Sequence, residues 1–288
     1  MNDAIKVMLN KYQCSSVNEY ENALKEIIQE IALLGLWRSK FFEKAAFYGG
    51  SALRILYGLN RFSEDLDFSL LKKDEKFSLQ TYCTAVENEL KSFGFSVFVE
   101  TKEKKIETNI DSAFIKAGTL KNMLIIDIPG ALSNKIHSGK LMKIKLEVDK
   151  DPPGGFETEA KYLFQPIPFS VNTFTLHHLF AGKMHAVLCR SWKKRVKGRD
   201  WYDLAWYVGQ DIALNVKHLE NRMRQTEHLK ADESLTEHRL KEKLKERIHD
   251  TDWNNARKDV ENLVKDPASL SLWSSEFFNA ICDKIKVI

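Results

Sequence analysis

The sequence of 288 residues predicts an α/β domain over residues 1–170, followed by an all-helical domain over residues 171–288. Strand-like patterns occur only in the first part of the chain. The strongest break, Asp151-Pro152-Pro153-Gly154-Gly155, follows the last of them. Beyond Pro166 and Pro168 we interpret the remaining sequence as helical to the C-terminus.

The N-terminal part predicts helix, strand and helix in that order. Ser16-Val17-Asn18-Glu19 has the spacing of a capping box. Apolar residues recur behind it at helical intervals, at Leu24, Ile27, Ile28, Ile31 and Leu34. The apolar stretch 45–48 predicts a buried strand, which leads into Gly49-Gly50-Ser51 and a short helix over 52–57. Gly58 is placed to end that helix as its C-cap.

The next hundred residues predict further strands around one helix. Residues 66–70 alternate like a second strand, and a helix is expected over 79–93, before Gly94. Three more strands are expected over 96–101, 124–128 and 141–149. The last alternates cleanly, with apolar residues on one face and charged residues on the other.

The composition excludes several classes of protein. With 43% apolar and 29% charged residues, the chain is neither disordered nor of low complexity. Its start lacks the apolar segment of a signal peptide, and no apolar run approaches the ~20 residues that span a bilayer, so we expect a cytoplasmic protein. The four cysteines form no CxxC pair, which argues against a disulfide scaffold or a zinc-organised fold.

The net charge of +4 is modest, but its distribution is uneven. Residues 183–203 contain seven Lys and Arg against two Asp, a local charge of +5. Such a segment could hold a phosphate-rich ligand by charge. A solvated, lysine-rich surface is the alternative interpretation.

The stretch after residue 48 contains two features that a triphosphate-using enzyme needs. A strand followed by Gly49-Gly50-Ser51 and a helix can present backbone N–H groups to phosphate oxygens. Glycines allow close approach, and a helix N-terminus favours anions. Asp65 and Asp67 are two residues apart in a strand-like run, so both carboxylates point to one side and could hold Mg²⁺.

A third carboxylate on a neighbouring strand would complete a two-metal clamp. Glu147 is the first candidate, and Asp149, on the same face of the strand predicted over 141–149, is the second. Taken singly, each feature has a structural explanation, because Gly-Gly-Ser turns, Asp-x-Asp pairs and charged strand faces are common. Their occurrence together, in this order along the chain, favours a functional site.

Other polar residues near these motifs carry a weaker signal. Arg61 and Ser63 precede the Asp-x-Asp pair, where a phosphate contact and a surface turn are equally compatible with the sequence. The pair His177-His178 has no matching carboxylate cluster, and no acidic residue lies one turn from His185. We therefore interpret these histidines as structural.

The motifs resemble those of the nucleotidyltransferase fold superfamily, whose signature is a Gly-Gly or Gly-Ser turn followed by an Asp-x-Asp pair. Residues 47–53 with 61–68 are most similar to the AbiEii/AbiGii toxin family of bacterial abortive-infection systems. A second block agrees, because residues 179–186 and 195–203 resemble the helix with Lys and the Arg-Asp-x-Tyr-Asp run of that family. The spacing from Ser51 to Asp65 is at the long end for the superfamily.

The resemblance implies a nucleotidyltransferase-fold domain with a mixed sheet, whose active site the helical domain completes. It assigns phosphate binding to Gly50 and Ser51 of the turn. We add Gly49 as part of the same turn, and Arg61 and Ser63 as candidates from their position alone. The resemblance assigns metal binding to Asp65 and Asp67, with Glu147 as a less fixed third ligand, and further catalytic roles to Lys183 and Asp200.

The activity implied is Mg²⁺-dependent transfer of NMP from an NTP to an acceptor, with release of pyrophosphate. The family implies the toxin of a toxin–antitoxin pair, with RNA such as tRNA as the acceptor and a cognate antitoxin as partner. The alternatives are an antibiotic-type small-molecule nucleotidyltransferase and a non-catalytic RNA- or protein-binding member. A weaker alternative is a glycosyltransferase that holds a metal ion with Asp-x-Asp, because that activity does not explain the Gly-Gly-Ser turn.

Overall fold

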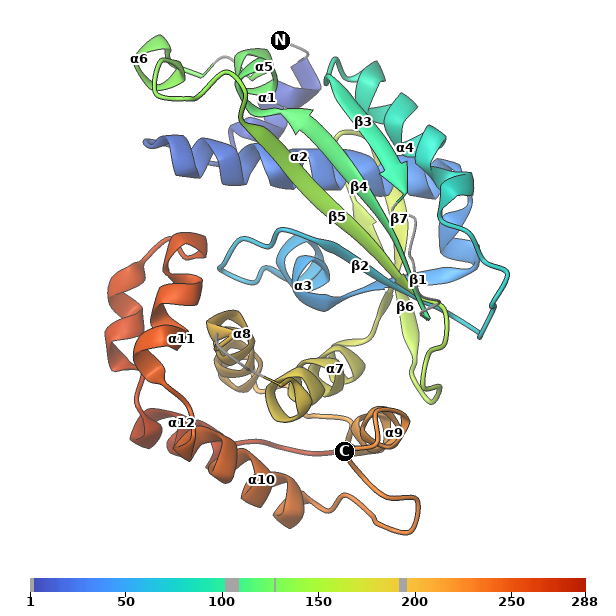
Figure 1. The fold of residues 1–288 in the computed structure, drawn as a ribbon, viewed down its shortest axis with the longest axis vertical. Coiled ribbons are helices and arrows are strands. Elements are labelled where there is room, and N and C mark those ends of the chain that lie inside the picture. Colours follow the sequence, from blue (N-terminus) through green and yellow to red (C-terminus); the bar gives the residue numbers. More distant parts are fainter. Residues whose placement is uncertain (1–2, 102–108, 127, 192–195) are drawn as a thin grey trace. The chain divides into compact units, whose positions relative to one another are not determined.

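The computed structural model describes residues 3–101, 109–126, 128–191 and 196–288, and its first part is built on a mixed sheet (Figure 1). Within these residues the strand order is β3-β4-β5-β2-β1-β7-β6. The strands are β1 (Ala45–Tyr48), β2 (Leu66–Leu70), β3 (Val97–Thr101), β4 (Ile110–Gly118), β5 (Leu141–Asp149), β6 (Thr158–Leu163) and β7 (Phe169–Phe174). Strand β2 is antiparallel to β1 and parallel to β5, which confirms the predicted mixed sheet.

The chain divides into two compact units. The first unit comprises Met1–Gly58, Phe62–Pro152 and Glu159–Thr173, and the second comprises Leu59–Arg61, Pro153–Thr158 and Phe174–Ile288. The division at Thr173 lies close to the predicted boundary after residue 170. Two short segments depart from a simple division, because residues 59–61 and 153–158 belong to the second unit.

The helices of the first unit cover the sheet, and the longest of them lies across it beside α4 (Figure 1). They are α1 (Asp3–Leu9), α2 (Val17–Arg38), α3 (Gly49–Tyr57), α4 (Gln80–Ser92), α5 (Thr119–Ile125) and α6 (Gly130–Ser133), with a 3₁₀ turn over Phe41–Glu43. The predicted capping box begins α2, since Ser16 Oγ accepts from the Glu19 amide and the Glu19 carboxylate accepts from the Ser16 amide. This prediction is confirmed.

The core of the first unit lies between α2 and the sheet. All five apolar residues predicted on the inner face of α2 are completely buried. On the sheet side, the rings of Phe47 on β1 and Phe68 on β2 lie 5.2 Å apart, and Phe41 packs edge-on against Phe68 at 4.9 Å. These contacts anchor β1 and β2, the two strands that carry the predicted site residues.

Two predictions of secondary structure are wrong. Residues 124–128 do not form a strand, because they include the end of α5 and the turn after it; residue 127 lies outside the described residues. Helix α5 is anchored by the buried amide of Asn122, which donates to the carbonyls of Gly118 and Ser96. A short apolar run fits a helix end as well as a strand.

The region after Pro168 is not wholly helical, because β7 lies there and β6 precedes it. In β7 the completely or nearly buried Phe169, Val171 and Thr173 alternate with half-buried Ser170 and Asn172. This is the two-residue period of a strand.

From residue 176 onward the second unit is helical, as predicted. Its helices are α7 (Leu176–Cys189), α8 (Gly198–Gly209), α9 (Val216–Gln225), α10 (Glu237–His249), α11 (Trp253–Val260) and α12 (Ser275–Asp283), with 3₁₀ turns over Glu261–Leu263 and Pro267–Leu272. Trp201 on α8 is completely buried, with ring centroids 5.0 Å from those of Trp253 and Phe278. None of the helices in the described ranges is both long and apolar enough to span a bilayer.

Gly198, the first residue of α8, has space for no side chain. A Cβ atom there would lie 1.8 Å from the carbonyl oxygen of Ala256 on α11. Real Cβ atoms essentially never approach so closely, and here the obstacle is backbone. The packing of α8 on α11 therefore requires glycine.

We expect Gly198→Ala to destabilise the protein by about 3 kcal/mol or more, because overpacking against a fixed backbone forces α8 away from α11. Gly209→Ala, at the other end of the same helix, is the control, since a Cβ there meets nothing within 4 Å. Chemical denaturation of the full chain measures both. Equal stabilities for the two variants would contradict the packing argument.

Candidate active site

The predicted phosphate-binding turn lies against the second aspartate of the Asp-x-Asp pair. Helix α3 begins directly after β1, and its first residue, Gly49, has a φ of +82°. A Cβ at Gly49 would lie 2.7 Å from Asp67 Oδ2, so both the backbone conformation and the close approach exclude a side chain. The turn and the Asp67 carboxylate therefore adjoin.

Ser51 joins the turn to the other aspartate. Its hydroxyl donates a short hydrogen bond to the Asp65 carbonyl oxygen, and the residue is only 1% exposed. In this structure the Ser51 side chain therefore links the start of α3 to the segment that enters β2. Contact of the Ser51 hydroxyl with phosphate stays a prediction.

The register of the sheet separates the two candidates for a third carboxylate. Strands β2 and β5 are parallel, with Asp67 beside Glu147 and Ser69 beside Asp149. Glu147 is therefore the acidic residue level with Asp67. Its carboxylate is engaged by Lys145 Nζ at 2.7 Å and lies 3.4 Å from Ser112 Oγ.

Asp65 and Asp67 are half-buried and carry the oxygen ligands that Mg²⁺ prefers. With Glu147 they do not form a group of three within ligand distance of one another in the described part of the chain. Mg²⁺ in phosphate-transfer sites commonly takes only one or two carboxylates and completes its shell with substrate phosphates and water. The aspartate pair fits that arrangement.

Helix α3 is fixed along its length by polar contacts within the first unit. Arg54 Nε donates to Glu26 on α2 at 2.8 Å, and the Arg54 guanidinium stacks over the Phe62 ring at 4.6 Å. At the end of the helix, the Tyr57 hydroxyl donates to Glu159 on β6 at 2.8 Å, and Lys161 lies over the Tyr57 ring.

Ser63, predicted as a phosphate contact, is half-buried in the segment before β2. Its carbonyl oxygen accepts from the Gln29 side chain of α2 at 3.0 Å. This contact fixes the backbone of Ser63, and a role for its hydroxyl stays a prediction.

In the second unit, Lys183 and Asp200 form an ion pair, which brings together the two residues that the family resemblance selected. Lys183 Nζ on α7 lies 2.8 Å from Asp200 Oδ1 on α8 and 2.8 Å from Asp203 Oδ2. The lysine side chain is 12% exposed, whereas both carboxylates are almost completely buried. One ammonium group is thus held by two aspartates.

Asp203 also holds Arg61, in a fully buried pair. Arg61 Nε and Nη2 donate to the two Asp203 oxygens at 2.6 and 2.7 Å, and Arg61 is 1% exposed. Burial alone would lower the pKa of Arg61, but the charge and hydrogen bonds of Asp203 overcome this and raise the pKa. The observed role of Arg61 is structural, and its predicted phosphate contact remains untested.

The sequence offered one signal for Asp203 that we did not use. Asp200 and Asp203 are three residues apart, so they lie on one face of a helix. The bond to Arg61 spans 142 residues of sequence, and no local pattern indicates it.

Two buried cations and two buried aspartates balance in this network, and the partly exposed Arg190 adds one positive charge. Arg190 Nη1 lies 3.2 Å from Asp200 Oδ2, so three cations, Lys183, Arg61 and Arg190, surround two aspartates, with a net charge of +1. Burial by itself would raise the pKa of Asp200, but Lys183 and then Arg190 offset it and hold the pKa below its ordinary value. Asp200 is therefore ionised at neutral pH.

A Gly-Gly-Ser turn against an Asp-x-Asp strand in a mixed sheet, with a helical unit after it, defines a protein of the nucleotidyltransferase fold. A family model described as "Nucleotidyl transferase AbiEii toxin, Type IV TA system" matches residues 31–278. The chain therefore belongs to the AbiEii family of nucleotidyl transferase toxins, which confirms the predicted family and enzyme class. No curated protein matches the chain.

Two crystal structures of Helicobacter pylori proteins share the fold. One, described as a candidate nucleotidyltransferase, is 16% identical with a TM-score of 0.52, covering 89% of this chain and 90% of its own. The other, JHP933, is 17% identical with a TM-score of 0.53, and the match covers 93% of this chain and 92% of JHP933. At these identities the likeness establishes the fold class that the sequence predicted.

We expect Asp203→Asn to destabilise the protein by about 3–5 kcal/mol, because it removes the carboxylate that pairs directly with the buried Arg61 guanidinium. Asp211→Asn is the matched control, since Asp211 pairs with Lys286 on the surface, where a salt bridge contributes little. Guanidinium unfolding of the full-length variants compares the two. A similar small loss for both would contradict the buried-pair argument.

Asp200 should make part of the free energy of unfolding depend on pH in the acidic range. Its folded pKa lies below the ordinary value of 3.8, so its contribution is present above that pH and is lost as pH falls through the folded pKa. We expect Asp200→Asn to lose less stability than the wild type between about pH 6 and pH 2. Melting temperatures across this range test it, and parallel curves would overturn the assignment.

Proposed function

We propose that this chain transfers a nucleotidyl group from an NTP to a hydroxyl group of RNA, such as tRNA, with Mg²⁺ held by Asp65 and Asp67. The observation that carries the proposal is the contact between Gly49 and Asp67. A turn suited to a triphosphate and a carboxylate suited to its metal ion occur side by side.

Triphosphate binding is assigned to the first turn of α3. Its N-terminal N–H groups and helix dipole favour phosphate, and the cap residue Tyr48 makes no side-chain hydrogen bond to that turn. When bound, Mg²⁺ would supply neutralisation of phosphate charge and polarisation of the phosphoryl oxygens. Asp65, Asp67 and the Gly49-Gly50 backbone would orient the substrate.

In the reaction, the acceptor hydroxyl oxygen forms a bond to the α-phosphorus of the NTP. The bond from that phosphorus to the oxygen bridging toward the β-phosphorus breaks, and pyrophosphate leaves with the electron pair. The hydroxyl proton passes to water. Negative charge grows on the leaving group, where a positioned ammonium group stabilises the transition state.

Lys183 is the residue to which we assign this stabilisation. Its contacts with Asp200 and Asp203 favour an orienting role for Asp200 over direct contact with the acceptor. The network has net positive charge, which suits a leaving pyrophosphate. The proposal includes a shared site, in which Lys183 and the Asp-x-Asp pair act together, as the family resemblance implies.

RNA is favoured as the acceptor by the basic segment 183–203. Of its members, Lys193, Lys194 and Arg195 lie outside the described residues. Arg190 is 42% exposed at its side chain and Lys197 is half-buried. Family membership also supports a cognate antitoxin as the partner in the cell.

Incubation of the purified protein with each α-labelled NTP, Mg²⁺ and total RNA tests the proposal. We expect label in RNA, abolished by EDTA and by Asp67→Asn, which removes a metal ligand. Lys183→Ala should slow transfer by on the order of 100–1000-fold with little loss of NTP affinity.

The matched controls are Asp149→Asn and Lys286→Ala. Asp149 lies two positions beyond Glu147 on β5 and is level with Ser69 instead of Asp67, and Lys286 lies on the surface. Both should transfer normally. Label only in small acceptors would favour the small-molecule alternative and overturn the RNA assignment. Normal transfer by Lys183→Ala, with Asp67→Asn inactive, would overturn the shared site and leave the metal assignment standing.

A further inference from the structure

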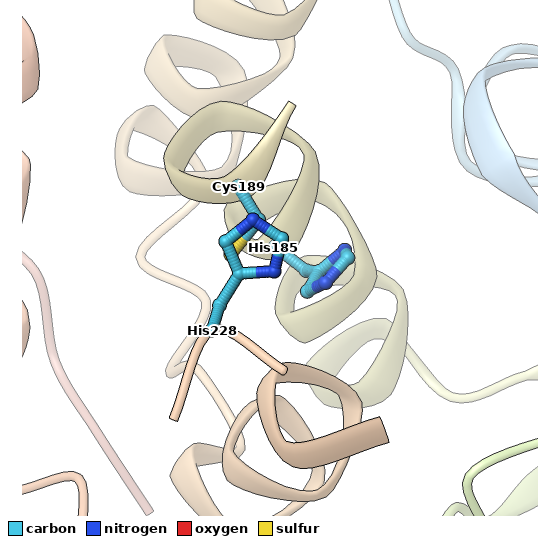
Figure 2. Close-up of side chains that lie close together, drawn as sticks. All are labelled: His185, Cys189 and His228. Atoms are coloured by element: carbon cyan, nitrogen blue, oxygen red, sulfur yellow. The ribbon is translucent and has the colours of Figure 1, made fainter. Parts of the chain in front are cut away.

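Three potential metal ligands gather at the end of α7, apart from the residues assigned to nucleotidyl transfer. His185 and Cys189 lie four residues apart, on one face of that helix, and His228 reaches them from the turn after α9 (Figure 2). One ligand atom from each residue lies within 4.8 Å of the other two. Among the described residues, these are the three His, Cys, Asp or Glu side chains whose ligand atoms lie close enough together to hold one metal ion.

We propose that His185, Cys189 and His228 bind a borderline-soft transition-metal ion, Zn²⁺, with water in a fourth position. Two imidazoles and one thiolate are ligands typical of zinc, and three protein ligands leave one site open. The set contains no carboxylate, so it does not suit the hard Mg²⁺ ion assigned to Asp65 and Asp67.

The geometry requires only a small adjustment. Tetrahedral zinc with bonds of about 2.0–2.3 Å places its ligand atoms about 3.3–3.8 Å apart. The side chains must therefore close by about 1 Å, and His228 is exposed and can turn. His185 and Cys189 are only half-buried, so an ion can enter from solvent.

A single hydroxyl group already contacts both imidazole rings. Thr226 Oγ1 lies 2.8 Å from His185 Nε2 and 3.0 Å from His228 Nδ1, and it donates to the Arg222 carbonyl. Because its own proton is used, the Thr226 oxygen can accept from both rings, which leaves the second nitrogen of each with its lone pair. Such outer hydrogen bonds set the tautomer of metal-binding histidines.

The turn that carries His228 is held in an uncommon conformation. Glu227 has a φ of +61°, and the His228 amide bonds to the Met223 carbonyl at 2.8 Å, which closes the end of α9. This turn points His228 toward α7. A bound ion would tie α7, the helix that carries Lys183, to the end of α9.

The charges around the cluster select among cations. Basic side chains act on two of the ligands, with Arg222 and Arg190 near His185 and Lys243 near Cys189. They repel a cation that binds by charge alone. At Cys189 they only partly offset burial, which raises the pKa of the thiol to about 11, so the metal ion itself must displace the proton. Zinc binding displaces the thiol proton to water, and the zinc–thiolate bond replaces the S–H bond.

The sequence alone did not reveal this cluster. We judged His185 by the absence of an acidic residue one turn away, whereas the residue one turn away is Cys189. The absence of CxxC pairs bears on a structural zinc site built from paired cysteines, whereas a site of three separate ligands needs no such pair.

The test uses the full-length chain, with any affinity tag removed, stripped of metal by a chelator and then titrated with Zn²⁺ or Co²⁺. We expect one equivalent of Zn²⁺ to be retained against a chromogenic chelator. Co²⁺ should give the visible bands of a tetrahedral site and a thiolate charge-transfer band. Zn²⁺ at a hundredfold excess over its Kd should raise the melting temperature by about 5–10 °C.

Cys189→Ser should abolish the charge-transfer band, and His228→Ala, in an exposed turn, should abolish zinc retention without disturbing the fold. Cys14→Ser and His238→Ala are the matched controls, since the first lies in the other unit and the second is 84% exposed on α10. Zinc retention that is equal in His228→Ala and the wild type would overturn the proposal, as would a cobalt spectrum unchanged by Cys189→Ser.

Discussion

The buried ion pair between Arg61 and Asp203 is the constraint on which the charged centre of the second unit depends. Burying two ions costs desolvation free energy, which must be offset by their mutual attraction and by hydrogen bonds to their neighbours. Asp203 is shared with Lys183, and Lys183 is shared with Asp200. Moving any one of these groups leaves a buried charge uncompensated. The ammonium group of Lys183 is therefore fixed by its own neighbours. For the catalytic role proposed for Lys183, this is favourable, because a fixed charge costs no reorganisation during the reaction.

A second constraint, steric rather than electrostatic, organises the first unit. The Asp67 carboxylate occupies the space that a side chain at position 49 would need, so the close approach of backbone and carboxylate depends on glycine. Helix α3 is meanwhile fixed by Arg54 at its middle and Tyr57 at its end. The N–H groups of its first turn are thus oriented by contacts well away from the turn, so the proposed binding of a triphosphate there would require little ordering of the chain.

Local patterns predicted much of the fold and the positions of the site motifs. The strand 45–48, the Gly58 cap and the strand 66–70 are observed as expected, because each is determined by a few consecutive residues. The pairing of Arg61 with Asp203 could not be predicted, since it joins residues far apart in sequence. The same holds for His228, which reaches His185 and Cys189 only through the path of α9. Short apolar runs such as 124–128 were misassigned because length and burial, rather than composition, decide between helix and strand.

The order of the sheet leaves β3 and β6 as its two outermost strands within the described residues. An outermost strand offers its outer backbone groups to any other strand, and here the exposed rings of Phe98 and Tyr162 would add an apolar attraction. Each strand also carries charge, from Glu100 paired with Lys116 on β3 and β4, and from Glu159 paired with Lys161 on β6. These groups would have to lose water before a second copy could add its strand. Glu159 and Lys161 on β6 are also the residues that contact Tyr57 at the end of α3. The same two charged side chains therefore fix that helix and oppose aggregation through β6.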